Sequence, residues 1–250
     1  MRQDSATSLD ANAAHARNVA ERIFFSSLAV LLALLVFVAF GPTYYWTAFG
    51  EGVTHTALGV RFTGIFHVHG AVFTAWVVLF VVQTLLIASR RVALHRRIGY
   101  SGAVVAAAMV ILGLLVAIET ARAGIAPAGG DPVSFMIVPM GDMVLFSGFV
   151  AAAILLRRNT DAHKRLMVVA YACLLVATLS RISAVSAIGP AAPVLGSFFP
   201  IVAGMVFDRR VHGRVHRVYL WGLAILLASG IRVPIGESVA WRSLASWLLT

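Results

Sequence analysis

The chain has 250 residues, of which 60% are apolar and 12% are charged, and its mean hydropathy is +0.90. Soluble domains are about 45–50% apolar and about 25% charged, so this composition excludes a soluble globular domain, a disordered chain and a coiled coil. A net charge of +10 could indicate nucleic-acid binding, but the basic residues cluster between apolar segments, which is typical of membrane proteins. We therefore expect a polytopic membrane protein whose partner is the lipid bilayer and not nucleic acid.

The N-terminal residues 1–22 are polar and rich in alanine, and we expect them to form a flexible or partly helical cytoplasmic tail. Residues 23–40 carry no charge and approach the roughly 20 residues needed to cross a bilayer. Their length favours a retained first span over a cleaved signal peptide. Further spans are predicted at residues 66–88, 100–118, 137–156, 166–185, 193–207 and 218–235. Because backbone groups in lipid must be paired, residues 23–236 are expected to form a single all-α bundle of about seven spans.

The distribution of basic residues predicts the orientation of these spans. Fifteen of the twenty Lys and Arg residues lie in the N-terminal segment, which has three, and in three short loops, which have four each. The positive-inside rule then places the N-terminus in the cytoplasm and, after seven spans, the C-terminus in the periplasm. Residues 237–250 place Trp241, Leu244, Trp247 and Leu248 on one helical face, which predicts an amphipathic helix at the outer interface.

The three basic loops resemble one another. They read RRVALHRRIG (90–99), RRNTDAHKRLM (157–167) and DRRVHGRVHRVYLWG (208–222). Each has an Arg-Arg pair, a short spacer, and a histidine followed by a basic residue. Orientation explains the arginines but does not require histidines at matching positions. The repeat predicts one leading helix followed by three tandem hairpins, an organisation known among membrane proteins.

The histidines of these loops are the first candidate site. They are His95, His163 and His216, with His212 one helical turn before His216. Neutral imidazole binds zinc, copper and iron, and two imidazoles on facing helices could hold a haem iron whose propionates pair with arginines. The surrounding positive charge favours haem b over a bare transition metal. The alternatives are contacts with lipid phosphates and a proton relay.

A second polar set is expected near the outer membrane face. Its members are Glu119, Asp142, Arg181 and Arg232, together with His67 and His69 at the start of the second span. Charged groups inside a membrane usually pair, and we expect Asp142 to pair with Arg181 because their depths are similar. This pair is either a structural clamp or part of a pocket for a metal, a quinone head group or a proton path. Residues two apart on a helix diverge, so only one of His67 and His69 should face inward as a metal or cofactor ligand.

Short motifs in residues 67–99 and 163–181 resemble those of a known family. The motifs are His-Gly-x-x-Phe-x-x-Trp at residues 69–76, Leu-His-Arg-Arg-x-Gly at 94–99 and His-Lys-Arg-Leu-Met at 163–167. They are similar to those of uncharacterised bacterial multi-pass inner-membrane proteins, which implies a location in the bacterial inner membrane but no activity. A looser similarity to small di-haem membrane cytochromes implies a bis-histidine haem. The chain departs from that pattern because, within its spans, it has outer-face histidines on the second span alone.

Three functions remain open at this stage, and none is decided by a known enzyme motif. The first is electron transfer through a haem or metal bound by His95, His163 and His216. The second is a non-catalytic accessory or assembly role within a respiratory complex, alongside other membrane subunits. The third is transport of a small molecule or protons, for which Asp142, Arg181 and His69 are the candidate residues.

Overall fold

The computed structural model describes residues 2–46, 64–126 and 130–250, and these residues form helices and turns without strands. Seven helices in this part of the chain are long and apolar enough to cross a membrane. The predicted all-α bundle of about seven spans is therefore confirmed. Helices satisfy their backbone hydrogen bonds internally, which is the requirement that lipid imposes on a spanning segment.

The first half of the bundle contains α1 (Arg2–Phe40), which continues into η1 (Gly41–Tyr45), then α3 (Gly64–Ala88) and α4 (Val92–Arg122). The fourth span joins α5 (Pro132–Phe135) to α6 (Ile137–Leu155), and the fifth is α7 (Thr160–Leu179). The remaining elements are α8 (Ser183–Ser186), α9 (Ala191–Ser197), α10 (Phe199–His212), α11 (Arg217–Ala228), η3 (Ser229–Ile231), α12 (Arg232–Gly236) and α13 (Val239–Leu249).

The helices extend beyond the apolar runs that predict them. The expected tail is part of α1 from Arg2 onward, and α4 begins at Val92, several residues before the predicted start at 100. Alanine and the long polar residues favour helix, so a helix continues where hydrophobicity stops. By contrast, α7 ends at Leu179 instead of 185, and the chain turns into α8 after the extended residue Ile182.

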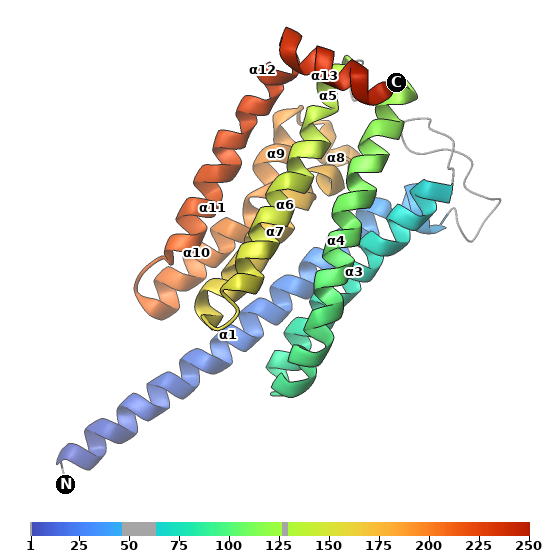
Figure 1. The fold of residues 1–250 in the computed structure, drawn as a ribbon. Helices are drawn as coiled ribbons and strands as arrows, with labels where there is room; N and C mark the ends of the chain where they lie inside the picture. Colours follow the sequence, from blue (N-terminus) through green and yellow to red (C-terminus); the bar gives the residue numbers. More distant parts are fainter. Residues whose placement is uncertain (1, 47–63, 127–129) are drawn as a thin grey trace.

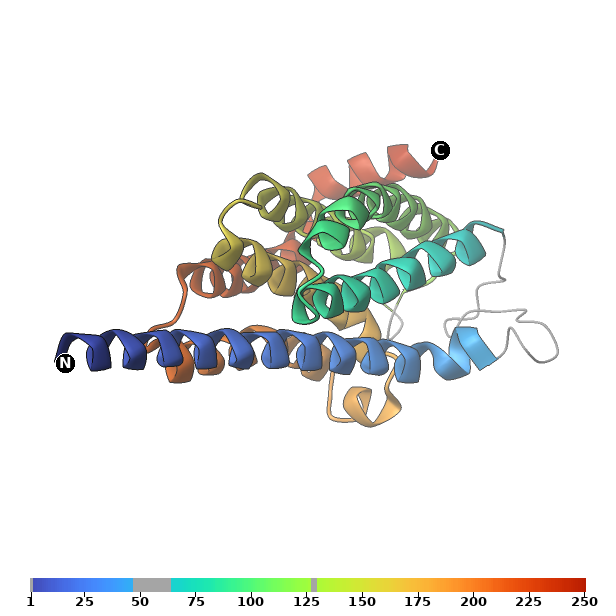
Figure 2. The same cartoon turned by 90° about the horizontal axis from the view of Figure 1, so that it is seen from below.

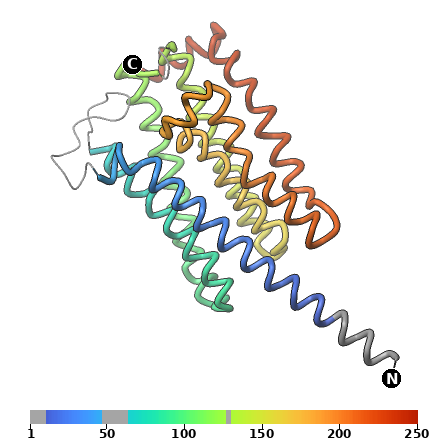
Figure 3. Tube along the Cα trace, turned by 180° about the vertical axis from the view of Figure 1, so that it is seen from behind, coloured from blue at the N-terminus to red at the C-terminus, as the bar shows by residue number. Residues whose placement is uncertain are grey.

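Three hairpins turn at one end of the molecule, as the sequence repeat predicts (Figure 1). They are α3–α4, α6–α7 and α10–α11, and we call this the arginine-rich end because it carries the basic residues of 90–97, 157–165 and 209–217. The N-terminal part of α1 extends past this end, and the rest of α1 lies along one side of the bundle (Figure 2). The tube view in Figure 3 shows that α13 lies at the opposite end.

Helix α7 is the centre of the bundle. It packs against α1, α6, α9, α10 and α11, and its residues from Leu166 to Leu179 are largely buried. The other long helices each leave an apolar side uncovered, as Val104 and Val144 show with exposed fractions of 71% and 65%. Such uncovered apolar surface is what a bilayer is expected to cover.

The C-terminal segment forms a helix, α13, but the residues that pack differ from the predicted face. Trp241 and Leu248 pack against α4 and α5, and the indole of Trp241 donates a hydrogen bond to the Val133 carbonyl at 2.8 Å. Leu244 and Trp247 are instead half or more exposed. The spacing of apolar residues along α13 does not indicate which of them pack against the bundle and which remain exposed.

Candidate functional site

Two of the predicted histidines lie side by side at the arginine-rich end. The rings of His95 on α4 and His163 on α7 have centroids 6.4 Å apart and planes at 87°. Each ring also reaches back to the preceding helix of its hairpin. The Nδ1 atom of His163 lies 2.8 Å from the Ala153 carbonyl, and that of His95 lies 3.3 Å from the Gln83 carbonyl.

These backbone contacts orient the rings. A carbonyl oxygen only accepts, so the proton of His163 lies on Nδ1 and the lone pair lies on Nε2. For His95, the Gln83 carbonyl lies 3.3 Å from Nδ1, and the side-chain amide of Gln83 donates to the same Nδ1 atom, so the proton of a neutral ring lies on Nε2. No hydrogen-bond partner from the described chain lies on the Nε2 atom of either ring. Both rings are only partly buried, so these nitrogens are open to a ligand.

The other two histidines of this end do not join the pair. His216 is the N-cap of α11, where its Nδ1 accepts the Val218 N–H at 3.2 Å. The Nε2 of His212 lies 3.0 Å from a carboxylate oxygen of Glu21 on α1, but not in the orientation of a hydrogen bond. Only two of the four predicted histidines therefore lie together. His216 caps α11 and its backbone N–H binds Asp208, whereas His212 faces Glu21 of α1.

A buried ion pair that no sequence motif indicates lies beside these residues. Arg165 of α7 and Asp208 of α10 have side chains only 3% and 1% exposed, and the guanidinium binds both carboxylate oxygens, with Nε at 2.9 Å from Oδ2. The same carboxylate accepts the backbone N–H of His216 at 3.1 Å. In the sequence, Arg165 and Asp208 are charged residues at the ends of basic loops, a common pattern. Only the positions of their side chains show that they form a buried ion pair.

A shallow polar cavity of about 340 Å³ lies between α1 and α7 at this end. Lys164 is 2.7 Å from both Glu21 and Asp161, and His212 completes the wall. Two cations, Arg17 and Lys164, and two carboxylates, Glu21 and Asp161, line this cavity, so its formal charges balance. The cavity therefore offers no excess charge for a small ion.

The local environment of His216 favours its neutral form. Burial lowers the pKa of His216 below 6.5, and the cationic Arg165 nearby lowers it further, whereas Asp208 and Asp161 raise it. A neutral ring is required because Nδ1 must keep its lone pair to accept the Val218 N–H. His216 therefore acts as a helix cap in this structure.

At the opposite end, the expected pairing of Asp142 with Arg181 is wrong. Asp142 of α6 pairs with Arg232 of α12 at 2.8 Å, and Arg232 also donates to the Val138 carbonyl. Arg181 instead lies over the Phe40 ring at 4.2 Å and donates to the Ala177 carbonyl. Similar depth does not imply contact, because the Arg232 side chain reaches Asp142 from α12, whereas the Arg181 side chain lies over Phe40.

The remaining predicted residues are also separated. Glu119 pairs with Arg122 one turn later at 2.9 Å, on the exposed end of α4. His69 stacks on Phe73 at 4.0 Å, and its buried Nδ1 has no hydrogen-bond partner among the described residues. His67 is exposed and lies 6.3 Å from the Tyr44 ring. The two histidines thus face different surroundings, which suits the geometry of a regular helix.

Within the described ranges, no group of three or more His, Cys, Asp or Glu side chains could hold a metal ion. Comparison of the chain with protein-family models, with curated proteins and with solved structures finds no match. The pair of His95 and His163 is consequently the arrangement in which predicted ligands come together with an open ring nitrogen on each.

Proposed function

We propose that this chain is an integral membrane protein that binds one haem between His95 and His163 and transfers electrons through it. The observation that carries this proposal is the pair of adjacent imidazoles, each with Nδ1 at a backbone carbonyl and Nε2 open. The positive-inside rule would place this arginine-rich end in the cytoplasm of the bacterial inner membrane.

The number of available ligands supports haem over a bare ion. Zinc sites use three or four protein ligands, whereas two axial side chains suffice for a haem iron because the macrocycle supplies the others. The rings of His95 and His163, with centroids 6.4 Å apart, would supply these two side chains.

The surrounding residues have roles consistent with this ligand set. For His163, a hydrogen bond from Nδ1 to the Ala153 carbonyl fixes the tautomer and makes Nε2 a stronger donor to a metal. His95 would adopt the same tautomer on binding, with Nδ1 donating to the Gln83 carbonyl. The arginines of the same two loops, Arg96, Arg97, Arg157 and Arg158, could pair with carboxylates of a bound haem and would repel a free cation. A bound haem would supply one-electron chemistry, while this chain would hold and orient it.

The second candidate function is that of a structural accessory subunit, and one observation favours it. Ala153 lies in the last turn of α6, where carbonyls lack helical partners, and His163 donates to this carbonyl. The same hydrogen bond that would orient a ligand could therefore serve only to close the α6–α7 hairpin. Binding of hemin by the wild type and by His163 variants separates these two roles.

The composition of the central helix α7 gives less support to a transport function. Between Arg165 and Thr178, the central helix α7 contains only apolar residues apart from the hydroxyl of Tyr171 and the thiol of Cys173. A charged substrate crossing beside this stretch would lose its hydration without gaining charged or amide partners from α7. The charged groups of the described spans instead lie near the two ends.

A titration with hemin tests the proposal on purified protein in detergent. The wild-type protein should bind one hemin per chain with a shifted visible spectrum, and His163→Gln should lose most of this binding. Glutamine retains an N–H that can reach the Ala153 carbonyl, so the melting temperature should change little. His212→Gln serves as the control, because His212 lies in the same end but outside the pair.

Two outcomes would contradict a haem role. If His163→Gln and His95→Gln both bind hemin as the wild type does, the pair is not the ligand set. If neither variant nor the wild type gives a saturable spectral change, whereas His163→Ala lowers the melting temperature, the hairpin-closing role is the correct one.

A further inference from the structure

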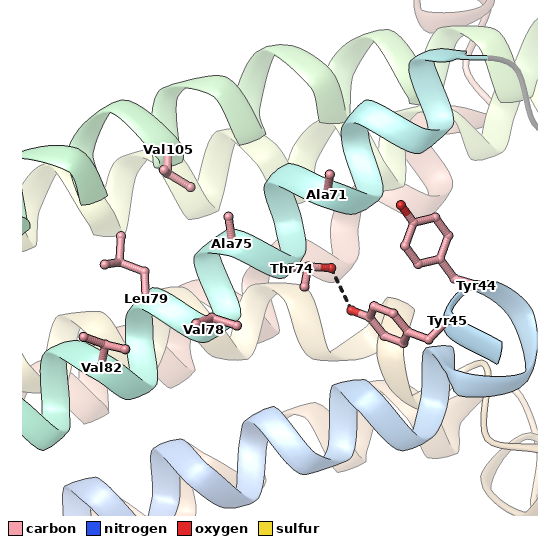
Figure 4. Close-up of a pocket in the computed structure, with 9 residues that line it drawn as sticks. All are labelled: Tyr44, Tyr45, Ala71, Thr74, Ala75, Val78, Leu79, Val82 and Val105. Atoms are coloured by element: carbon pink, nitrogen blue, oxygen red, sulfur yellow. Dashed lines mark hydrogen bonds between the residues drawn. The ribbon is translucent and has the colours of Figure 1, made fainter. Parts of the chain in front are cut away.

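A long apolar groove lies on the side of the bundle, and neither histidine of the pair lines it. Its volume is about 630 Å³, within the range of small-molecule sites, and its walls come from α3, α4 and the end of the first span (Figure 4). The α3 residues Ala71, Ala75, Val78 and Val82 follow one helical face, and Val105 of α4 lies beside them. The groove is deepest at Ala71 and Ala75, because their side chains are smaller than those of the other lining residues.

The tyrosines Tyr44 and Tyr45 close one end of this groove. Tyr45 reaches α3 from η1 and forms a 2.7 Å hydrogen bond with the Thr74 hydroxyl, as Figure 4 shows. The Thr74 proton is donated to the Gly70 carbonyl, so Tyr45 is the donor of the pair. Tyr44 donates to the His67 carbonyl at 3.2 Å. Both tyrosine protons are thus used within the protein, and the groove offers an occupant shape and apolar contact alone.

The length of the groove matches one leaflet of a bilayer. The distance from Ala71 to Val82 along α3 is about 16 Å at 1.5 Å per residue, and half of a bilayer's hydrocarbon core is about 15 Å. The groove residue Val78 is itself exposed, and so is Val104 of α4, the chain neighbour of the groove residue Val105. In a bilayer, the acyl chains of phospholipids would contact that exposed surface.

We propose that this groove holds one acyl chain of a bilayer phospholipid, recognised by its hydrocarbon chain and not by its headgroup. A straight transmembrane helix fits less well, since Tyr44 and Tyr45 obstruct one end and a helix is about 10–12 Å wide. A flexible chain can end at this obstruction. The proposal does not depend on the proposed haem, because neither His95 nor His163 lines the groove.

Photo-crosslinking in vesicles tests this proposal. The probe is a phosphatidylcholine with a diazirine on one acyl chain, present as a minor component of phosphatidylethanolamine–phosphatidylglycerol vesicles that contain the full chain. We expect label concentrated on residues 71–82 and at Val105. In Ala75→Leu, which fills the hollow, labelling there should fall about tenfold, as expected when contact with two or so methylenes is lost. Changing the labelled lipid's headgroup should leave the yield unaltered.

The controls make each outcome decisive. Ala151→Leu places the same extra volume on an exposed position of α6 and should label as the wild type does. Ala71→Leu is a second groove variant, used if Ala75→Leu has a lower melting temperature. Uniform labelling of all exposed apolar faces, or unchanged labelling in both groove variants, would overturn the proposal. Chain-to-chain crosslinks at these residues would assign the groove to a second copy instead.

Discussion

At the residue scale, two pairs of oppositely charged side chains near the ends of the spans join different helices. Arg165 and Asp208 connect α7 to α10, and Asp142 and Arg232 connect α6 to α12. Composition predicts that such groups need partners, but not which partner each one finds. The choice depends on how α12 returns against α6, which no spacing in the chain specifies.

The buried pair at the arginine-rich end should tolerate joint replacement better than single replacement. Asp208→Ala leaves the Arg165 guanidinium buried without its carboxylate, which we expect to lower the free energy of unfolding by about 3–5 kcal/mol. Arg165→Met combined with Asp208→Leu should recover most of this loss. Chemical unfolding in detergent measures both. A double variant as unstable as Asp208→Ala would show that the charges themselves are required.

Asp142 should be coupled to Arg232 and not to Arg181. Intramembrane polar interactions measured by double-mutant cycles are about 0.5–2 kcal/mol, and we expect a coupling energy in that range for alanine variants of Asp142 and Arg232. The cycle of Asp142 with Arg181 should give a value near zero, because Arg181 contacts Phe40 and the Ala177 carbonyl. The reverse ranking would invalidate the observed pairing.

The cap at His216 predicts a dependence of stability on pH. Its pKa is below 6.5 in the folded protein, chiefly because of burial, so the unfolded chain binds more protons as the pH falls below about 6.5. The contribution of His216 to stability is therefore complete above this pH and is lost as the pH falls toward the folded-state pKa. Unfolding measured between pH 7.5 and about 5 should show this decline.

Asparagine provides the matched variant for this test, because it is a good N-cap that does not titrate in this range. His216→Asn should have a smaller loss of stability between the two pH limits than the wild type. Equal slopes for both proteins would mean that another group is responsible for the decline.

At the element scale, the repeat of Arg-Arg and His correctly predicts the three hairpins but not how each histidine is used. His95 and His163 contact the preceding helix, whereas His216 caps the following one. The difference arises because Asp208 binds the backbone of the third loop, which the first two loops cannot match. The observed helix ends also differ from the predicted ones, because an apolar run indicates the part of a helix that crosses the membrane and not the whole helix.

The contact between α10 and α11 depends on a glycine. A Cβ atom at Gly204 would overlap the Tyr219 ring, which is fully buried, so the two helices approach closely there. We expect Gly204→Ala to lower the free energy of unfolding by about 1–3 kcal/mol through overpacking. Gly148→Ala on α6 is the control, since nothing lies within 4 Å of its Cβ position. A neutral Gly204→Ala would imply that Tyr219 can move.

At the scale of the whole molecule, the fold was predictable because composition and run length determine what a bilayer accepts. Sixty per cent of the residues are apolar, and the described part of the chain has seven helices long and apolar enough to cross a membrane. In lipid, such continuous apolar segments pair their backbone groups by forming helices. The candidate site was predictable in part: the residue types of His95 and His163 indicated a ligand set. The separation of His212 and His216 from that set depends on side-chain contacts with Glu21 and Asp208 across helices far apart in the chain.

The visible absorption spectrum of the protein purified from its native membrane tests the central claim most directly. It should be recorded oxidised and then reduced with dithionite, with iron measured on the same sample. We predict a reduced-minus-oxidised haem band with one iron per chain, absent from the His95→Gln, His163→Gln double variant. A colourless wild-type protein without bound iron would contradict the account and would assign the two histidines to closure of their hairpins.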